Sequence, residues 1–167
     1  MPLNGTKLSV SFDTMQTSAL DLVTGQATVD LLKEIVLGSG TSSGQADRLF
    51  TDRRTLAASA TENLDLAAVL LDAFNATLTF VKLKAILIIA DSGNTNNVNV
   101  IREATNGVPL FLAAGDGVPV QPGGIFLWVA PGAGVTVTPS TGDLITVTNS
   151  AGGTPVTYDV YLLGTSA

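Results

Sequence analysis

Hydrophobic and polar positions alternate along most of the last two thirds of the chain. Short runs of Val, Ile, Leu and Thr are separated by Gly, Pro, Asn and Ser, a pattern typical of β-strands joined by turns. It predicts strands over residues 77–90, 97–101, 108–112, 125–129, 135–138, 144–148 and 156–163. Turn signals recur roughly every 8 to 12 residues, which is the spacing expected of a β-sandwich or barrel.

The predicted strand over residues 77–90 contains the most continuous apolar run. Alternation places Val81, Leu83, Ala85, Leu87 and Ile89 on one face. Two lysines and then two isoleucines occupy the other face, so the second half of this strand is expected to be buried on both sides.

The first third of the chain has a weaker pattern. Apolar residues alternate with serines over residues 7–13, which predicts a strand. Val29, Leu32, Ile35 and Val36 have helical spacing, but the apolar run over residues 35–37 also suits a short buried strand, and we favour the strand.

A Gly/Ser/Thr segment without charge, residues 38–44, is predicted to be a flexible joint. Strands are expected over residues 45–56 and 62–66, followed by a single helical turn over 66–71 and a loop. We therefore divide the chain into an N-terminal arm with its linker, residues 1–44, and a β-sandwich domain, residues 45–167.

Cysteine and histidine are both absent from the 167 residues. Their absence removes thiolate nucleophiles, imidazole bases and the usual transition-metal ligands. Charged residues make up only 13% of the chain, against roughly 25% in an ordinary soluble domain. Since charge is depleted at the centre of subunit interfaces, this composition favours a protein that associates with its neighbours. We expect no catalytic residues, no cofactor and no metal site.

Eight basic and fourteen acidic residues give a net charge of −6, which disfavours binding to nucleic acid. The densest basic segment interleaves Arg48, Arg53 and Arg54 with Asp47 and Asp52. This segment is expected to be a locally paired strand or an interface anchor rather than a phosphate clamp.

Trp128 lies in a strand that is apolar on both faces, so a place in the core or in a subunit interface is favoured over a carbohydrate platform. The candidate interface residues are Arg48, Phe50, Arg53, Arg54 and Trp128. No apolar run reaches the roughly 18 to 20 residues of a membrane span. The first seven residues lack the features of a signal peptide, so synthesis in a cytoplasm is expected.

An apolar strand followed by Asp91-Ser92-Gly93 resembles the active-site signature of aspartic proteases, in which two carboxylates share a proton. One copy of the signature would require a homodimer. The apolar pair followed by Gly that this family places behind its site is matched only by Leu162-Leu163-Gly164, close to the C-terminus. We favour the alternative in which Asp91 caps a turn and Gly93 adopts positive φ.

The oxygens of Asp91, Asn94, Asn96 and Asn97 could also bind Ca²⁺. A well-bound calcium ion needs more than one carboxylate, and no closing Glu is present at EF-hand spacing. An Asn-rich turn is therefore the preferred interpretation.

Several longer segments resemble a family of small virion proteins encoded by tailed bacteriophages. The segments that carry the resemblance are residues 45–52, 54–60, 63–66, 93–97 and the ending 158–166, which reads Tyr-Asp-Val-Tyr-Leu-Leu-Gly-Thr-Ser. The likeness extends over roughly residues 20–167. The resemblance implies that the chain serves as a capsid decoration or cement protein, as a head fibre or as a part of the tail. It implies no catalytic residues.

We therefore expect an all-β chain with a jelly-roll-like antiparallel β-sandwich and an extended N-terminal arm. The expected function is that of a capsid decoration or cement protein on the virion surface, a homo-oligomer, most simply a trimer, that bridges major capsid subunits. The alternative is a head or tail fibre domain that recognises host glycans. A homodimeric aspartic protease that uses Asp91 is the remote alternative.

Overall fold

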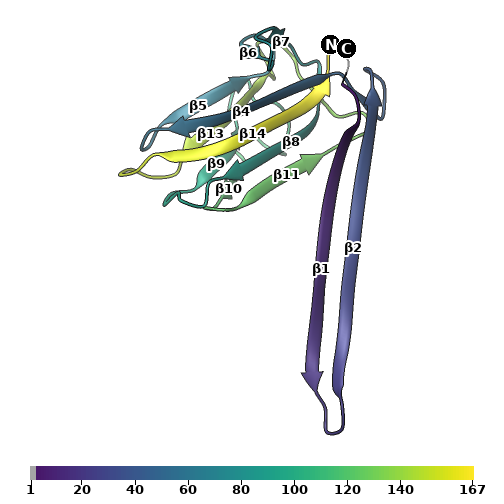
Figure 1. Cartoon of the computed structure of the whole chain (residues 1–167). Helices are drawn as coiled ribbons and strands as arrows, with labels where there is room; N and C mark the ends of the chain where they lie inside the picture. Colours follow the sequence, from purple (N-terminus) through teal and green to yellow (C-terminus); the bar gives the residue numbers. More distant parts are fainter. Residues whose placement is uncertain (1–2) are drawn as a thin grey trace.

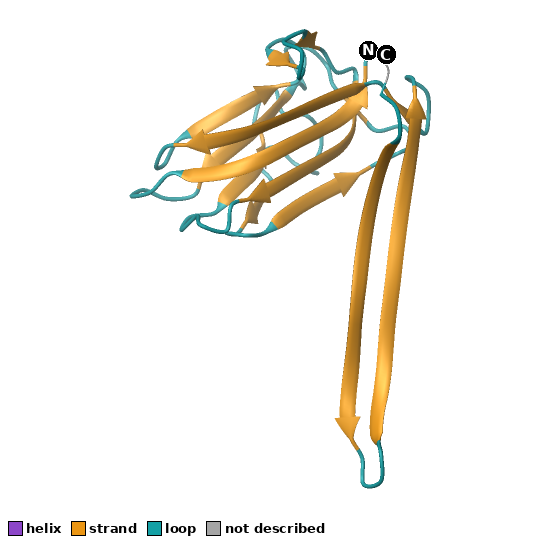
Figure 2. Cartoon of the chain, viewed as in Figure 1, coloured by secondary structure: helices purple, strands orange, loops and turns teal. Residues whose placement is uncertain are grey.

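The computed structural model describes residues 3–167, which contain strands and turns but no helix. A compact β-sandwich carries a long two-stranded hairpin that projects away from it (Figures 1 and 2). The strands are β1 (Thr6–Ala19), β2 (Thr24–Ser39), β3 (Gln45–Ala46), β4 (Arg48–Leu56), β5 (Thr61–Asp65), β6 (Leu70–Leu71), β7 (Thr77–Leu78), β8 (Lys82–Ala90), β9 (Val98–Arg102), β10 (Gly117–Val120), β11 (Ile125–Val129), β12 (Val135–Thr136), β13 (Leu144–Asn149) and β14 (Val156–Thr165).

Two antiparallel sheets form the sandwich. The first, which we call the arm-side sheet, has the strand order β11-β8-β14-β4, and β12 also pairs with β8. The second has the order β10-β9-β13-β5. Inward side chains of both sheets form one core, as Ile86 and Leu162 of the arm-side sheet lie in the same buried cluster as Val100 and Val147 of the second. The predicted all-β class and the sandwich are confirmed, while the jelly-roll connectivity stays a prediction.

A β-bulge changes the side-chain pattern of β8. Leu163 pairs with Ala85 and Gly164 with Leu83, so Lys84 is the extra residue. Leu83 therefore joins Ile86 and Ile88 in the core, whereas Ala85 lies in a separate cluster on the other face. The prediction that Leu83 and Ala85 share a face was wrong, because simple alternation does not account for a bulge.

Lys84 is itself buried, and its ammonium group donates a hydrogen bond to the carbonyl of Gly132. Burial lowers the pKa of this lysine, and the neighbouring charge of Lys82 lowers it further. A lysine at this depth was not predicted from the alternation of residues 77–90, because its burial depends on the bulge.

The strand predicted over residues 108–112 does not form. Residues 109–115 are turns and bends, and the Arg102 guanidinium donates to the carbonyl oxygens of Phe111 (2.9 Å) and Leu112 (3.2 Å). Pro109 cannot donate to a ladder, and Arg102 satisfies acceptors that a neighbouring strand would otherwise take. The helical turn predicted over residues 66–71 is replaced by a plain turn that leads into β6.

The hairpin, which we call the arm, is longer than the sequence predicted. Its antiparallel register runs without interruption from Thr6 opposite Leu37 to Ala19 opposite Thr24. The segment predicted to be a flexible joint continues β2 through Ser39 and then turns. Its backbone is held at the sandwich by a hydrogen bond from the Gly44 amide to the Pro131 carbonyl (2.9 Å). Within residues 3–167 there is no helix of the length and hydropathy needed to span a membrane.

Candidate functional site

The two faces of the arm differ in chemistry. Residues directly opposite each other in an antiparallel pair place their side chains on the same face. One face, which we call the apolar arm face, is formed by Leu8, Val10, Phe12, Val29, Leu31, Ile35 and Leu37, with Ala27, Lys33 and a few small polar residues. The opposite face carries Lys7, Ser9, Ser11, Asp13, Asp30 and Glu34, with Met15, Leu32 and Val36 among them. The arm is therefore an amphipathic ribbon.

Most of the apolar arm face is in contact with solvent. Phe12 is 60% exposed and Leu31, directly opposite it, is 52% exposed. Burial increases only toward the base, where Leu8 and Ile35 are half-buried and Leu37 is buried. These base residues pack with Ala85 and Leu163 of the sandwich.

A second apolar surface covers the outside of the arm-side sheet. Since Ile86 and Ile88 point into the core, their neighbours on β8 point outward. We call this the outer sheet surface, and its side chains are Leu49, Ala85, Leu87, Ile89, Ile125, Leu127, Val129, Tyr161 and Leu163. Ile125 is 65% exposed.

The apolar arm face and the outer sheet surface meet at the base of the arm. A hollow of about 400 Å³ lies in the angle between them, lined by side chains from both parts, among them Leu8, Leu49, Leu87 and Tyr161. The two surfaces are therefore one continuous, angled apolar surface.

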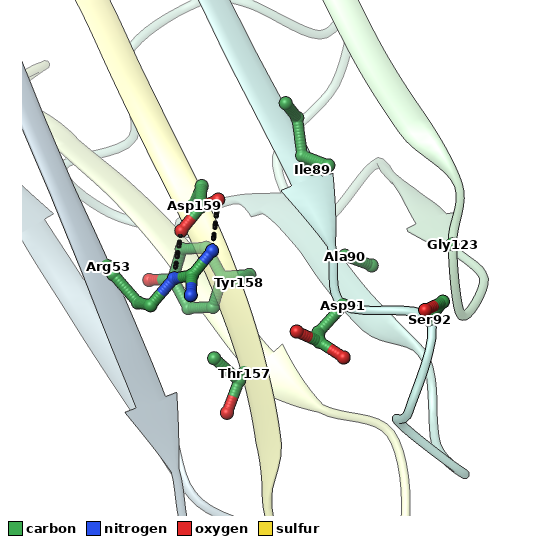
Figure 3. A pocket seen from close by; sticks show the side chains of 9 residues that line it. All are labelled: Arg53, Ile89, Ala90, Asp91, Ser92, Gly123, Thr157, Tyr158 and Asp159. Carbon is green, nitrogen blue, oxygen red and sulfur yellow. Dashed lines mark hydrogen bonds and ion pairs between the residues drawn. The ribbon is translucent and has the colours of Figure 1, made fainter.

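A polar notch of about 290 Å³ is lined by Arg53, Asp91 and Asp159, among others (Figure 3). It lies at the end of the outer sheet surface opposite the arm base, which packs on Ala85 and Leu163. Arg53 of β4 donates to both carboxylate oxygens of Asp159 of β14, from Nε at 2.6 Å and from Nη2 at 2.9 Å. These hydrogen bonds hold the pKa of Asp159 below its usual value. Because Asp159 stays ionised and paired, it is a poor proton acceptor for catalysis.

Asp91 lies in the same notch, in the turn that the sequence predicted. Its Oδ1 accepts a hydrogen bond from the Gly93 amide at 2.8 Å. Gly93 does not have positive φ; Gly123, in the turn that faces it, has φ of 72°. The predicted cap is therefore present, but the predicted left-handed glycine was the wrong one.

The segments that an aspartic protease signature would bring together lie apart. The strand next to Asp91 contributes Tyr158, which pairs with Ala90, whereas Leu162 pairs with Ile86. Leu163 and Gly164 therefore lie beside Ala85 and Leu83, toward the end of β8 that is opposite Asp91. Nothing in this geometry favours the protease.

Two of the three asparagines that were considered as calcium ligands, Asn94 and Asn96, bind protein atoms instead. Asn94 accepts from the Thr157 amide (2.8 Å) and donates to the Thr157 carbonyl (2.9 Å). Asn96 donates to Asn149 Oδ1 at 3.0 Å and to the Thr154 carbonyl at 3.2 Å. Among residues 3–167, no three carboxylate, His or Cys side chains come together as a metal site.

Of the five candidate interface residues, the structure places Arg53 openly on the surface. Phe50 is buried in the core, and Trp128 is half-buried and packed against it, so no observation favours Trp128 as a glycan platform. Arg48 pairs with Asp47 (3.3 Å). Local pairing, one of the two interpretations of this basic segment, is therefore observed.

Arg54 belongs to a network at the edge of the core. It pairs with Asp52 (3.2 Å) and Glu62 (2.6 Å), and its guanidinium lies 5.7 Å from the centroid of the Phe50 ring. Tyr158 donates its hydroxyl hydrogen to Glu62 Oε1 at 2.6 Å, and burial together with this carboxylate raises the pKa of the tyrosine. The network gives Asp52 and Arg54 of β4 a structural role.

Sequence reasoning missed the apolar arm face. The alternation of Leu8, Val10 and Phe12 was visible, but the strand that completes the face contains the pair Leu31-Leu32, which obscures period two. A turn near residue 21, with segments of similar length on either side, was the feature of the sequence that could have predicted the hairpin.

Comparison of the chain with protein-family models, with curated proteins and with solved structures gives no match.

Proposed function

We propose that this chain is a structural protein of a tailed-phage virion, which decorates the capsid surface and stabilises the head by bridging major capsid subunits. The observation that carries the proposal is the projecting arm with its exposed apolar face. The resemblance of the sequence to small phage virion proteins supports a phage virion as the assembly to which the chain belongs. The arm would attach the chain to that assembly.

The physical state of the arm supports an assembly role. A two-stranded hairpin is at best marginally stable alone in water, because each strand has only one partner and neither face is covered. The 14 residues of β1 make an arm about 46 Å long, at about 3.3 Å per residue. Such an element gains its stability when another protein covers it, and its length lets it reach beyond the sandwich to a neighbouring subunit.

The open edges of the arm add a second means of binding. In the sheet order β1-β2-β3, β1 is an edge strand along its whole length, and β2 pairs with β3 only at Gly38 and Ser39. Unpaired backbone groups along both edges can accept a further strand from a partner. This geometry fits bridging by apolar and backbone contacts, since the apolar arm face has a single charged residue, Lys33.

The test is the position and copy number of the protein in particles of the phage that encodes it. We expect cryo-electron microscopy to show the chain at symmetric sites on the head, with at least one copy per vertex. Particles that lack the chain should lose their genome at lower temperature and recover when the purified protein is added. Presence only in tails, or fewer copies than vertices, would overturn the proposal.

A further inference from the structure

We infer that the apolar arm face of one copy packs on the outer sheet surface of a second copy of this chain. The inference rests on the proposed function in treating the arm as an assembly element, and it names the partner of that element. Each copy would give its arm to one neighbour and receive the arm of another.

The chain cannot cover these surfaces by itself. The arm leaves the sandwich at its base and runs away from it, so the part beyond Leu8 and Ile35 has no sandwich residue against it (Figure 1). A layer from another molecule is needed to bury Val10, Phe12 and Leu31.

The chain already contains a small example of the proposed contact. At the base of the arm, Leu37 packs with Ala85 and Leu163 in one buried cluster, and Leu8 and Ile35 contact this cluster. Side chains of the apolar arm face therefore fit the outer sheet surface. A second arm would extend this contact to the uncovered remainder, where Leu127, Ile125 and Ile89 lie.

The two surfaces have similar sizes. With strands about 4.8 Å apart and a rise of about 3.3 Å per residue, the arm face covers roughly 450 Å² in projection, and four strands of the sheet cover a similar area. Each arm-to-sheet contact would bury roughly 450 Å² on each partner, about half of the roughly 800 Å² per partner of a standard interface, so the assembly gains from a closed ring in which every copy makes two such contacts.

Charge also favours this pairing. Lys33 is the only charged residue of the apolar arm face, and it forms no ion pair with residues 3–167. At the far end of the outer sheet surface, Arg53 and Asp159 neutralise each other, so Asp91 leaves that end with a net negative charge. A positively charged arm face and a negatively charged sheet end attract each other.

A contact between two different surfaces of the same chain generates a ring when its rotation closes. A trimer is the smallest ring in which each copy contacts one neighbour through its arm and another through its sheet. A trimer is therefore the expected state of the purified protein.

The first test measures the mass of the purified full-length chain by analytical ultracentrifugation over a range of concentrations, without any capsid protein. Leu31→Thr removes apolar area from the arm face, and Leu32→Thr, at the next residue on the opposite face, is the matched control. These residues are 52% and 60% exposed, so neither change disturbs the core. We expect Leu31→Thr to weaken association at least about tenfold, while Leu32→Thr associates like the unmodified chain.

A second matched pair tests the sheet. Ile125 on the outer sheet surface and Val69 in the turn before β6 are both 65% exposed. Ile125→Thr is expected to weaken association as Leu31→Thr does, and Val69→Thr to leave it unchanged. An unmodified chain that stays monomeric up to high concentration would overturn the inference, as would equal effects within either pair.

Because the chain contains no cysteine, introduced cysteines can identify the contact directly. A copy with Leu31→Cys is mixed with copies that carry Cys in place of Leu87, Ile125 or Leu127, and the mixtures are oxidised. We expect a disulfide between the arm cysteine and at least one sheet cysteine, and none when Leu32→Cys replaces Leu31→Cys. Disulfides only between two arm cysteines would replace the inferred contact with an arm-to-arm contact.

These outcomes are separable from those for the proposed function. A monomer that still binds capsid particles through Leu31 would make the capsid the partner of the arm, and the proposed function would stand without the inference. A trimer that binds no capsid would leave the inference standing and remove the proposed function.

Discussion

Leu31 and Leu32 are consecutive residues of β2 and lie on opposite faces of the arm, Leu31 opposite Phe12 and Leu32 opposite Ser11. The first belongs to the apolar arm face, which continues onto the sandwich, and the second lies among serines and carboxylates. Two leucines of similar exposure therefore have different expected roles, and their difference depends only on the register of one hairpin.

The distal arm is expected to contribute little to the stability of the sandwich. In a shortened variant, an Asn-Gly turn replaces residues 11–32 and joins Val10 to Lys33, which are already opposite each other. The contacts of Leu8, Ile35 and Leu37 with the sandwich are kept. We expect the melting temperature of the monomer, measured by circular dichroism, to change by less than about 4 °C, the effect of roughly 1 kcal/mol in a domain of this size.

The same variant also tests whether the arm is needed for association. It should remain monomeric at concentrations where the full chain associates. If the variant fails to fold, the distal arm is part of the folding unit of the sandwich, contrary to this prediction.

The hydroxyl group of Tyr158 is expected to stabilise the edge of the core. Tyr158→Phe removes the hydrogen bond to Glu62 but leaves Glu62 paired with Arg54. We expect a loss of about 1 kcal/mol in the free energy of unfolding, measured by urea denaturation, which is typical for one internal hydrogen bond. Tyr161→Phe is the matched control, because no hydrogen bond joins the Tyr161 hydroxyl to residues 3–167, and it should change stability little. If Tyr158→Phe and Tyr161→Phe lower the free energy of unfolding equally, the hydrogen bond from Tyr158 to Glu62 does not stabilise the protein.

Gly164 is expected to be required at the bulge of the arm-side sheet. A Cβ atom at this position would lie 2.1 Å from the carbonyl oxygen of Lys82 and 2.6 Å from the Phe80 ring. Because one neighbour is a backbone atom and the other is the buried Phe80, Gly164→Ala must shift the backbone, and we expect a loss of at least about 2 kcal/mol in thermal or urea unfolding. Gly132→Ala is the control, since a Cβ there meets nothing within 4 Å. A stable Gly164→Ala protein would mean that the bulge can relax.

Much of the sandwich could be predicted from the sequence, because its strands have a clear period of two and are separated by Gly, Pro and Asn. The strands over residues 125–129 and 144–148 were found nearly at their observed bounds. The bulge at Lys84 and the missing strand at 108–112 could not be predicted, since they depend on contacts with Gly164 and Arg102 that are distant in sequence.

The candidate surface was harder to predict than the fold. Arg53 was singled out and does lie on the outer sheet surface, but Phe50 and Arg54 on either side of it point inward. The apolar arm face is a property of register, as Phe12 and Leu31 become neighbours only when β1 and β2 pair. Composition indicated a protein with buried interfaces, but it could not say which residues form them.

The Arg53–Asp159 pair is expected to make stability depend on pH. Hydrogen bonding to Arg53 lowers the pKa of Asp159 in the folded chain, so the folded state binds fewer protons than the unfolded state at acidic pH. The contribution of Asp159 is therefore complete above the unfolded pKa of about 3.9 and is lost as the pH falls through the lower pKa of the folded state. Asp159→Asn, which cannot ionise, should be less stable than the unmodified chain at pH 7, and the difference should shrink toward pH 2. Urea denaturation at a series of pH values measures this difference, with Asp116→Asn as a control distant from Arg53. A difference that stays constant with pH would mean that the ion pair with Arg53 adds nothing to stability.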